Sequence, residues 1–429
     1  MDYQRITVKS DLLGEEYTKI KHKSGLDIYV FPKELTTSYC LIATRFGSVD
    51  NTFRLEGEEE FVTVPDGVAH FLEHKMFENE DGEDTFVKFS RTGANANAYT
   101  STRVTAYLFS CTEELYPSLG ILLKSVFSPY FTEENVKKEQ GIIAQEIRQG
   151  EDNPYNAVLY GMLEGLYEKN SVRISIAGTV PSIMQITPET LYRCHKAFYN
   201  PANTALCVCG QAEVEEVLRV ADEVLSNIAP VKVESKSVTE GKKAFQTRVE
   251  KKMQVAKPLV CIGVKDVDIS SDPEERVRRS LAMNVIEELC FGKTSRLYND
   301  LYDEGLISPS FGCWHAHTPQ FSFFSASSDT DEPDILAQRI KDYTVSDIFE
   351  AVNEENLERC RRVMYSDFIK SFDSTDEIAN VLITDFALDG AEMFRFYEHI
   401  NSLTVDYVKD VIRELFTPEA FTVSVVMPI

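Results

Sequence analysis

The stretch Ile186-Thr187-Pro188-Glu189-Thr190-Leu191 carries helix-start residues and leads into Ala197-Phe198-Tyr199-Asn200-Pro201-Ala202, after which the chain turns apolar. The same order of residue types returns 217 positions later, in Leu403-Thr404-Val405-Asp406-Tyr407-Val408 and then Glu414-Leu415-Phe416-Thr417-Pro418-Glu419. Either copy alone would be an ordinary combination of helix-start and turn residues. Their shared order points to an internal repeat.

A second pair of segments supports the repeat. Residues 133–136 and 354–357 both read Glu-Glu-Asn followed by an aliphatic residue, and they lie 221 positions apart. Two matches with nearly the same offset predict a duplicated domain. The stretch between the halves is polar and shows no helical or strand period, so we expect an N-terminal domain at 1–230, a linker at 231–244 and a homologous C-terminal domain at 245–429.

Each half alternates two kinds of segment. Short β-branched or aromatic runs such as 41–45, 106–110 and 259–263 alternate with longer amphipathic stretches such as 133–149 and 406–415. This alternation is typical of an α+β fold. We therefore expect two duplicated α/β domains, each with a mixed or antiparallel sheet packed with helices.

Composition and charge exclude two classes of binding partner. The 429 residues include 44 Lys and Arg against 69 Asp and Glu, which gives 44 − 69 = −25. So acidic a chain repels phosphate backbones unless basic residues cluster, and the richest basic stretch, 232–252, is interrupted by glutamates. We expect no nucleic-acid partner and no anionic membrane surface.

The cysteines indicate the compartment. There are nine of them, scattered, without a C-x-x-C pair, and most lie in apolar runs such as Ala205–Cys209, where a free thiol behaves as a small hydrophobe. This use of cysteine favours a reducing compartment. Residues 1–6 lack an apolar leader pattern and 18 consecutive apolar residues occur nowhere, so we expect a cytoplasmic protein without a membrane anchor.

The sharpest local motif is the H-x-x-E-H run His70-Phe71-Leu72-Glu73-His74, which follows Pro65-Asp66-Gly67. We expect a helix with Asp66 as its N-cap. Residues four apart on a helix lie about 40° from each other, so His70 and His74 share a face and can bind one metal ion. Glu73 lies on the same flank, where it could accept a proton from a metal-bound water as a general base.

Two histidines are one ligand short of a catalytic zinc site, which has three protein ligands and an open position. The amphipathic stretch 133–149 offers Glu139 and Glu146, seven residues apart and within about 20° on one helical face. Either one could bind the metal while the other orients a histidine.

Three segments together resemble a known family: His70 to Phe77, Gly93 to Ser101 and Glu139 to Ile147. In order, spacing and context they are similar to the inverted-zincin metallopeptidases of the pitrilysin family, which includes insulin-degrading enzyme and mitochondrial processing peptidase. Ala197 to Asn203 resembles the segment that ends the family's domain. The resemblance is close over the first 210 residues and extends to the rest through the repeat. It implies the processing-peptidase fold in its small two-domain bacterial form.

The resemblance assigns roles residue by residue. It implies that His70, His74 and Glu146 are the ligands of one zinc ion per chain, that Glu73 is the general base, and that Glu139 orients a histidine ligand. Asn97, Ala98 and Tyr99 match the edge strand on which the family binds an extended peptide by β-augmentation, a mode that makes little demand on side chains. Such an enzyme prefers short or unfolded peptides.

One family feature is missing. In self-sufficient members the second domain supplies an Arg and a Tyr in an R-x6-Y run, but here the matching positions fall near Tyr302 and Ser308. Arg296 with Tyr302 has the wrong spacing, and residues 284–288 show that the second domain also lacks the zinc motif. The resemblance therefore implies a homologous partner chain that supplies the Arg/Tyr pair in a heterodimer, or else a homodimer.

We expect a zinc-dependent endopeptidase, or the zinc-bearing subunit of a heterodimeric peptidase, that hydrolyses short or unfolded peptides. The alternative is a non-catalytic peptide-binding or assembly subunit of the same family. A lyase of the ribosylhomocysteine-cleaving type also carries H-x-x-E-H, but that fold is a single small domain and does not fit a duplicated chain.

Overall fold

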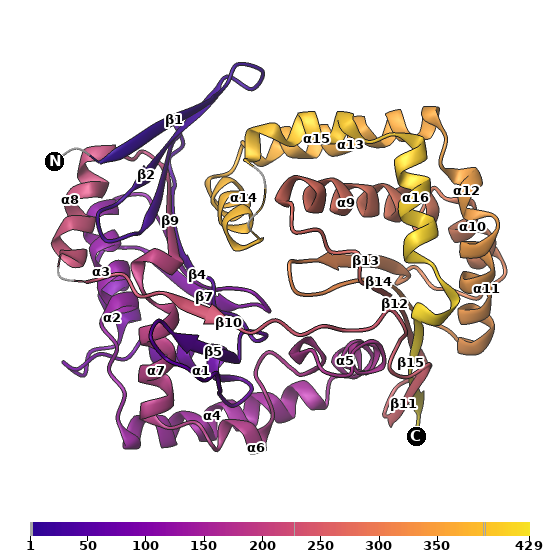
Figure 1. The fold of residues 1–429 in the computed structure, drawn as a ribbon, viewed down its shortest axis with the longest axis horizontal. Helices are drawn as coiled ribbons and strands as arrows, with labels where there is room; N and C mark the ends of the chain where they lie inside the picture. Colours follow the sequence, from indigo (N-terminus) through magenta and orange to yellow (C-terminus); the bar gives the residue numbers. More distant parts are fainter. Residues whose placement is uncertain (1–2, 227, 389, 391) are drawn as a thin grey trace. The chain divides into compact units, whose positions relative to one another are not determined.

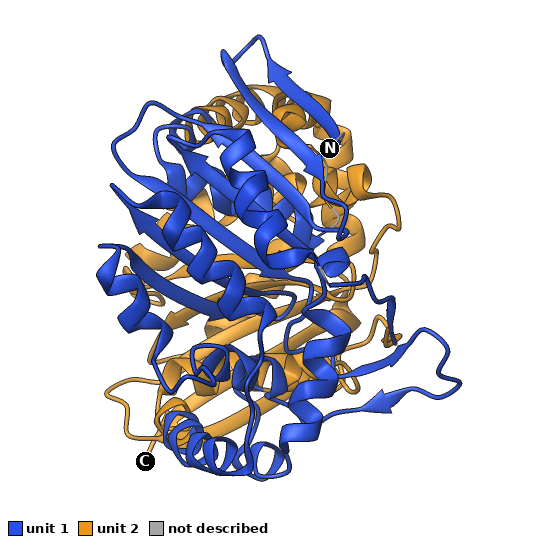
Figure 2. Ribbon diagram, turned by 90° about the vertical axis from the view of Figure 1, so that its left-hand side faces the viewer, with its two compact units in different colours: residues 1–147, 175–236, 369–388 blue, residues 148–174, 237–368, 389–429 orange. Residues whose placement is uncertain are grey.

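The computed structural model describes residues 3–226, 228–388, 390 and 392–429 (Figure 1). The chain falls into two compact units (Figure 2): unit 1 comprises residues 1–147, 175–236 and 369–388, and unit 2 comprises 148–174, 237–368 and 389–429. The change from unit 1 to unit 2 at 236/237 lies inside the expected linker, 231–244. The units differ from the expected consecutive domains because 148–174 and 369–388 each belong to the unit built mainly from the other half. The apolar face of a helix does not encode which sheet it will cover.

Unit 1 contains a seven-stranded sheet in the order β1-β2-β3-β9-β4-β8-β7, in which only β3 and β9 pair in parallel. Its central strand β9 is buried throughout, and its neighbour β4 is buried at every position except Tyr39, as expected for apolar runs in the middle of a covered sheet. The strands are β1 (Gln4–Ser10), β2 (Glu15–Lys21), β3 (Asp27–Pro32), β4 (Ser38–Thr44), β7 (Asn95–Thr100), β8 (Thr105–Cys111) and β9 (Thr204–Gly210).

A small sheet in the same unit includes part of the expected linker. It contains β5 (Thr52–Leu55), β6 (Val62–Thr63) and β10 (Val233–Ser235), and β10 lies inside the stretch 231–244, for which we expected no regular structure. Three residues are too few to produce a detectable alternation of polar and apolar positions, so pairing with β5 decides the outcome.

Helices cover both faces of the large sheet of unit 1. Helices α1, α2 and α3 pack against β7 and β8, whereas α14 (Thr375–Leu388) packs against β4 and β9 (Figure 1). Cys40 and Ile42 of β4 share a core cluster with Phe71 of α1, and on the side of α14 the guanidinium of Arg45 lies 4.0 Å from the ring centroid of Phe386. The other helices of the unit are α1 (Val68–Lys75), α2 (Thr85–Arg91), α3 (Leu115–Phe127), α4 (Glu133–Glu151), α6 (Val180–Ile183), α7 (Pro188–Phe198) and α8 (Val214–Leu225).

Unit 2 has a five-stranded sheet in the order β11-β15-β12-β14-β13, with β11 and β15 in parallel. The strands are β11 (Arg248–Met253), β12 (Leu259–Asp266), β13 (Gly312–His317), β14 (Ser322–Asp329) and β15 (Phe421–Pro428). The helices are α5 (Pro154–Leu166), α9 (Pro273–Ile286), α10 (Arg296–Asp303), α11 (Pro333–Val345), α12 (Ile348–Ala351), α13 (Glu354–Ser371), α15 (Phe396–Ser402) and α16 (Val405–Leu415). Among the helices of the described ranges, none combines the length and the apolar character needed to cross a membrane.

The duplicated α/β fold is confirmed. The order β3-β9-β4-β8-β7 in unit 1 repeats as β11-β15-β12-β14-β13 in unit 2 with the same parallel and antiparallel pairings. The repeated segments of the sequence occupy equivalent places. Thr187 caps α7 and Thr404 caps α16, and short 3-10 turns at Pro201–Asn203 and Pro418–Ala420 lead into β9 and β15.

Helix α1 starts where two loops approach each other closely. Its N-cap is Gly67 at φ 90°, and not Asp66, which we expected; the Asp66 carboxylate instead accepts a hydrogen bond from Asn51 at 2.8 Å. A Cβ on Gly67 would lie 2.4 Å from the carbonyl oxygen of Ala177, and a Cβ on Gly178 would lie 2.4 Å from that of Asp66. Both backbones need glycine, and together they fix the start of α1.

We predict that Gly178→Ala destabilises unit 1 more than Gly82→Ala does. Both glycines have similar left-handed φ values, +76° and +75°, but only at Gly178 does an added Cβ meet another backbone. Gly82→Ala should cost about 1–2 kcal/mol for the backbone conformation alone. Gly178→Ala should cost about 1–3 kcal/mol more because of the clash. Urea unfolding followed by circular dichroism measures both, and equal losses would show that the close approach does not matter.

Candidate metal centre

Helix α1 presents two imidazoles on one face. Its other face is apolar and buries Val68, Ala69, Phe71 and Leu72 against the core, which leaves His70 and His74 one turn apart on the flank. Their ring centroids are 4.6 Å apart. The sequence motif therefore forms the helix that we predicted, with both histidines on the same side.

The third group comes from α4. Glu146 Oε1 lies 3.4 Å from His70 Nε2, and Glu146 Oε2 lies 3.6 Å from His74 Nε2. Ligands bound tetrahedrally to zinc at about 2.0–2.1 Å would be roughly 3.3 Å apart, close to these separations. Among the described residues, His70, His74 and Glu146 are the one group of three or more His, Cys, Asp or Glu whose ligand atoms converge, within 4.8 Å.

This donor set fits a zinc ion. Two neutral imidazole nitrogens and one carboxylate are a known three-ligand set of catalytic zinc sites, which keep a fourth position open. The Glu146 side chain is 48% exposed, so the cluster is accessible from solvent on one side. Of the two glutamates that the sequence left open as a third ligand, the structure brings Glu146 to both histidines.

Glu139, the other glutamate, contacts the far nitrogen of one histidine. It is buried on α4, and its Oε1 lies 3.0 Å from His74 Nδ1. Burial lowers the pKa of His74, but the hydrogen bond to Glu139 and the charges of Glu139, Glu146 and Glu73 outweigh it, so the pKa is raised overall. Burial also raises the pKa of Glu139, yet His74 and Lys75 hold it below its usual value. His70 differs from His74, because its buried Nδ1 has no hydrogen-bond partner among the described residues.

Glu73 contacts the edge strand. The hydroxyl of Thr100, the last residue of β7, donates a hydrogen bond of 2.6 Å to Glu73 Oε2. Sequence reasoning did not select Thr100. The two-residue period of the strand was the available signal, because Thr100 shares a face with Ala96 and Ala98, which pack toward the core under α1.

The segment Asn97-Ala98-Tyr99 lies in β7, the outermost strand of the large sheet of unit 1. Asn97 and Tyr99 are exposed, and Tyr99 has 36% of its surface accessible to solvent. The Ala98 N–H donates to its neighbour's side-chain oxygen, Asn97 Oδ1, at 2.9 Å. This strand has the position that peptide addition to a sheet edge requires.

In unit 2 the equivalent elements make different contacts. Glu287, which follows α9, accepts from His315 Nδ1 of β13 at 3.0 Å, and His315 Nε2 lies 3.0 Å from the Ser280 hydroxyl. His317, the other histidine of β13, lies 2.7 Å from the Ser322 hydroxyl. These contacts tie the helix to the sheet, and they agree with the absence of a zinc motif in the second half.

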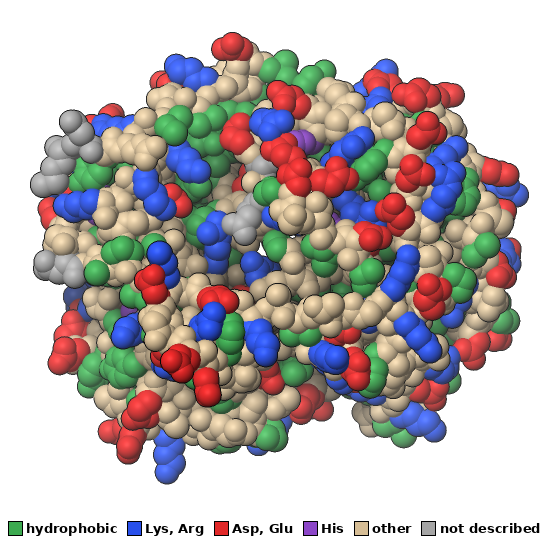
Figure 3. All heavy atoms as spheres, viewed as in Figure 1, with side chains coloured by type: hydrophobic (Ala, Val, Ile, Leu, Met, Phe, Trp, Pro, Cys, Tyr) green, Lys and Arg blue, Asp and Glu red, His purple; other side chains and the backbone are tan. Residues whose placement is uncertain are grey.

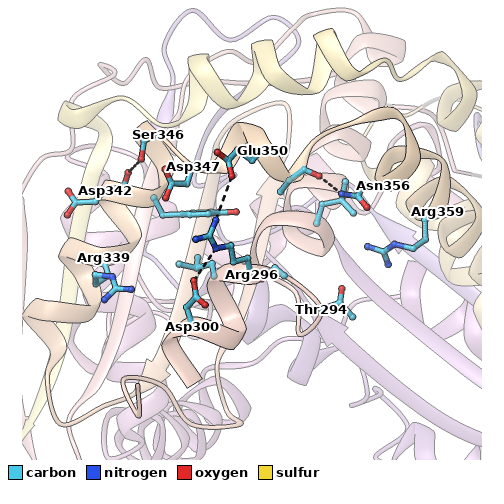
Figure 4. Close-up of a pocket in the computed structure, with 15 residues that line it drawn as sticks. Thr294, Arg296, Asp300, Arg339, Asp342, Ser346, Asp347, Glu350, Asn356 and Arg359 are labelled. Carbon is cyan, nitrogen blue, oxygen red and sulfur yellow. Dashed lines mark hydrogen bonds and ion pairs between the residues drawn. The ribbon is translucent and has the colours of Figure 1, made fainter. Parts of the chain in front are cut away.

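Arg296 and Tyr302 have partners in unit 2. These are the two residues whose spacing is wrong for the family's Arg/Tyr pair. Arg296 is 77% exposed and forms ion pairs with Asp300 at 3.5 Å and Glu350 at 3.7 Å at the rim of a cavity of about 440 Å³ (Figure 4). Tyr302 stacks on Tyr298, with ring centroids 6.0 Å apart. The two side chains thus serve separate local contacts.

On the face in Figure 3, acidic and basic side chains are interspersed and do not gather into fields of one sign. Mixed surface charge of this kind favours solubility and does not itself form a binding site.

The chain is similar to known proteins over nearly its whole length. Residues 64–180 match the family described as Insulinase (Peptidase family M16), and residues 185–364 match the one described as Peptidase M16 inactive domain. The uncharacterized zinc protease YmfH of Bacillus subtilis is 37% identical over 98% of this chain and 99% of its own length. The crystal structure of an M16-like peptidase from Alicyclobacillus acidocaldarius has a TM-score of 0.90 and 31% identity, and the match covers 100% of this chain and 99% of that one.

A more distant relative is the mitochondrial-processing peptidase subunit beta of Caenorhabditis elegans, which is 21% identical over 88% of this chain and 83% of its own length. The predicted resemblance to the pitrilysin family is confirmed by these matches, which span nearly the whole chain. The chain belongs to peptidase family M16, the insulinase family, whose relatives are named zinc proteases.

Proposed function

We propose that this chain is a zinc-dependent endopeptidase, or the zinc-bearing subunit of one, that acts on short or unfolded peptides. The observation that carries the proposal is the meeting of His70, His74 and Glu146 beside Glu73. These residues would hold one zinc ion per chain, and a zinc ion bound there would polarise the peptide carbonyl and acidify water. The names of the relatives support a zinc protease.

Glu73 is the general base in this proposal. Its carboxylate accepts a proton from the water that attacks the peptide carbonyl and then donates a proton to the amine that leaves. The 2.6 Å hydrogen bond from Thr100 occupies one carboxylate oxygen and limits the rotation of the side chain. Thr100 therefore supports Glu73 in the orientation that proton transfer needs.

Strand β7 is the proposed peptide-binding edge. An extended substrate would pair with the backbone at Asn97, Ala98 and Tyr99 and would extend the sheet by one strand. Thr100, at the end of the same strand, contacts Glu73, so a peptide along β7 would pass close to the base. Main-chain pairing requires an extended chain, which favours unfolded substrates.

A homologous partner chain is part of the proposal. The positions expected to carry the Arg/Tyr pair hold Tyr302 and Ser308, and Arg296 is engaged in ion pairs in unit 2. The relative named as a processing-peptidase subunit supports a heterodimer in which the partner supplies that pair. A homodimer remains the other arrangement to test.

The cytoplasm is the proposed location. All nine cysteines are free thiols, and eight of them are buried. Burial raises the pKa of Cys111 to about 11 and that of Cys209 to about 12, which keeps these thiols protonated and unreactive. Such thiols suit a reducing compartment.

A second candidate function is a non-catalytic peptide-binding or assembly subunit. Two observations favour it: the missing Arg/Tyr pair, and the match of residues 185–364 to a domain described as inactive. Against it, the three residues proposed as metal ligands converge in unit 1, and the residue proposed as the base lies on the same helix as two of them. The experiments below separate the two functions.

We predict that Glu73→Gln leaves zinc bound and reduces peptide hydrolysis by at least about 100-fold, because the amide cannot accept the proton. Zinc content measured by elemental analysis, together with cleavage of a quenched fluorescent peptide library with the homologous partner chain present, checks both parts. Glu80→Gln, which removes an exposed acid from the neighbouring loop, is the matched control and should change neither. Undiminished turnover by Glu73→Gln would exclude it as the base.

We also predict that cleavage requires a homologous chain with an R-x6-Y run in its second half. Mixing the two chains should raise the rate at least about 100-fold over either alone, because the partner donates groups that stabilise the intermediate. Glu73→Gln mixed with the intact partner should stay inactive, which would place hydrolysis on this chain. Full activity of this chain alone would refute the partner, and inactivity with every homologous chain would favour the second candidate function.

A further inference from the structure

Lys75, which follows His74 on α1, is a buried charge that the proposed chemistry does not use. Its side chain is 0% exposed, and it lies on the face of α1 that packs into the protein. Removing an ammonium group from water is costly unless nearby groups compensate for the lost hydration. The partners of Lys75 therefore show what holds it there.

Those partners lie in two other segments. Lys75 Nζ is 2.7 Å from Glu78 Oε2 in the loop after α1, 3.4 Å from the carbonyl oxygen of Asn135, and 3.8 Å from Glu139 Oε2. Asn135 and Glu139 belong to the first half of α4. Lys75 thus connects the helix that carries both histidines with the helix that carries Glu146.

Glu139 joins Lys75 to a metal ligand. One of its oxygens, Oε1, accepts from His74 Nδ1 at 3.0 Å, while the other, Oε2, faces the Lys75 ammonium. With both oxygens engaged, the carboxylate has little freedom to rotate, and the His74 ring keeps Nε2 directed toward Glu146. His70 has no comparable support, because within the described part of the chain its Nδ1 has no hydrogen-bond partner.

We propose that Lys75 is a positioning residue of the metal centre, which acts through Glu139 to fix His74 and through α4 to fix the distance to Glu146. The inference rests on the proposed metal site and adds a residue that the H-x-x-E-H motif does not contain. A purely structural role would be different: Lys75 would stabilise the fold, and its loss would leave the metal affinity of the folded protein unchanged.

The test is a double-mutant cycle on the full chain with Lys75→Met, Glu139→Gln and the combined variant. The measured quantity is zinc affinity, obtained by competition with a chromophoric chelator, and the absorption spectrum of the Co²⁺-loaded protein reports ligand geometry. We expect each single variant to weaken zinc binding by about 10–100-fold. We expect the combined variant to be no weaker than the weaker single one, because both changes break the same connection.

Two further variants serve as controls. Lys138→Met removes an exposed lysine next to Glu139 on α4 and should change zinc affinity less than about twofold. Lys75→Gln keeps the length and a hydrogen-bond donor without the charge, and it replaces Lys75→Met if that variant does not fold, as judged by circular dichroism.

Three results would overturn the inference. The first is an unchanged zinc affinity and Co²⁺ spectrum in folded Lys75→Met or Lys75→Gln. The second is that the losses of zinc affinity from Lys75→Met and Glu139→Gln add in the combined variant, which would mean that Lys75 does not act through Glu139. Unmodified chain that binds no stoichiometric zinc would overturn the metal site itself and this inference with it. The behaviour of the unmodified chain thus separates the failure of the proposed function from the failure of the positioning role.

Discussion

The site depends on one constraint: two helices that are distant in the sequence must bring three ligand atoms within a few ångströms of one another. His70 and His74 need only the regular geometry of α1, but Glu146 comes from α4 and reaches them only if both helices are held in register. A metal site tolerates errors of about 0.5 Å or less. The contacts around α1 therefore fix its position relative to α4.

Those contacts act at both ends of a short helix. At the start, Gly67 and Gly178 let two backbones approach more closely than any side chain would permit. At the end, the buried Lys75 reaches the first half of α4, and between them Phe71 and Leu72 are fully buried in the core of unit 1. An eight-residue helix has little stability of its own, so tertiary contacts of this kind must supply it.

The sequence predicted much of this structure, and its failures have physical causes. The repeat of start signals gave the duplicated fold, and the helical period placed His70, Glu73 and His74 correctly on one helix. It could not decide between Glu139 and Glu146, because both lie on one face of α4 and only the position of α1 distinguishes them. Asp66 was wrongly predicted as N-cap, since its carboxylate is engaged by Asn51 in another loop. Thr100 and Lys75 were missed because the contacts that link them to the site, with Glu73 and with α4, join positions that are distant in the sequence.

Helix α5 belongs to unit 2 and α14 to unit 1, although α5 lies in the first half of the chain and α14 in the second. This arrangement has a consequence for synthesis of the chain. The last strand of the large sheet of unit 1, β9, ends at Gly210, but the helix that covers one of its faces, α14, ends only at Leu388. At about 5–20 residues per second, that sheet face waits roughly 10–35 s on the ribosome without its helix. The sheet of unit 2 is likewise incomplete until β15 is made, at Phe421–Pro428. Neither unit can therefore reach its final packing until these late segments have been made, and in the interval the apolar face of the first sheet stays without the helix that covers it.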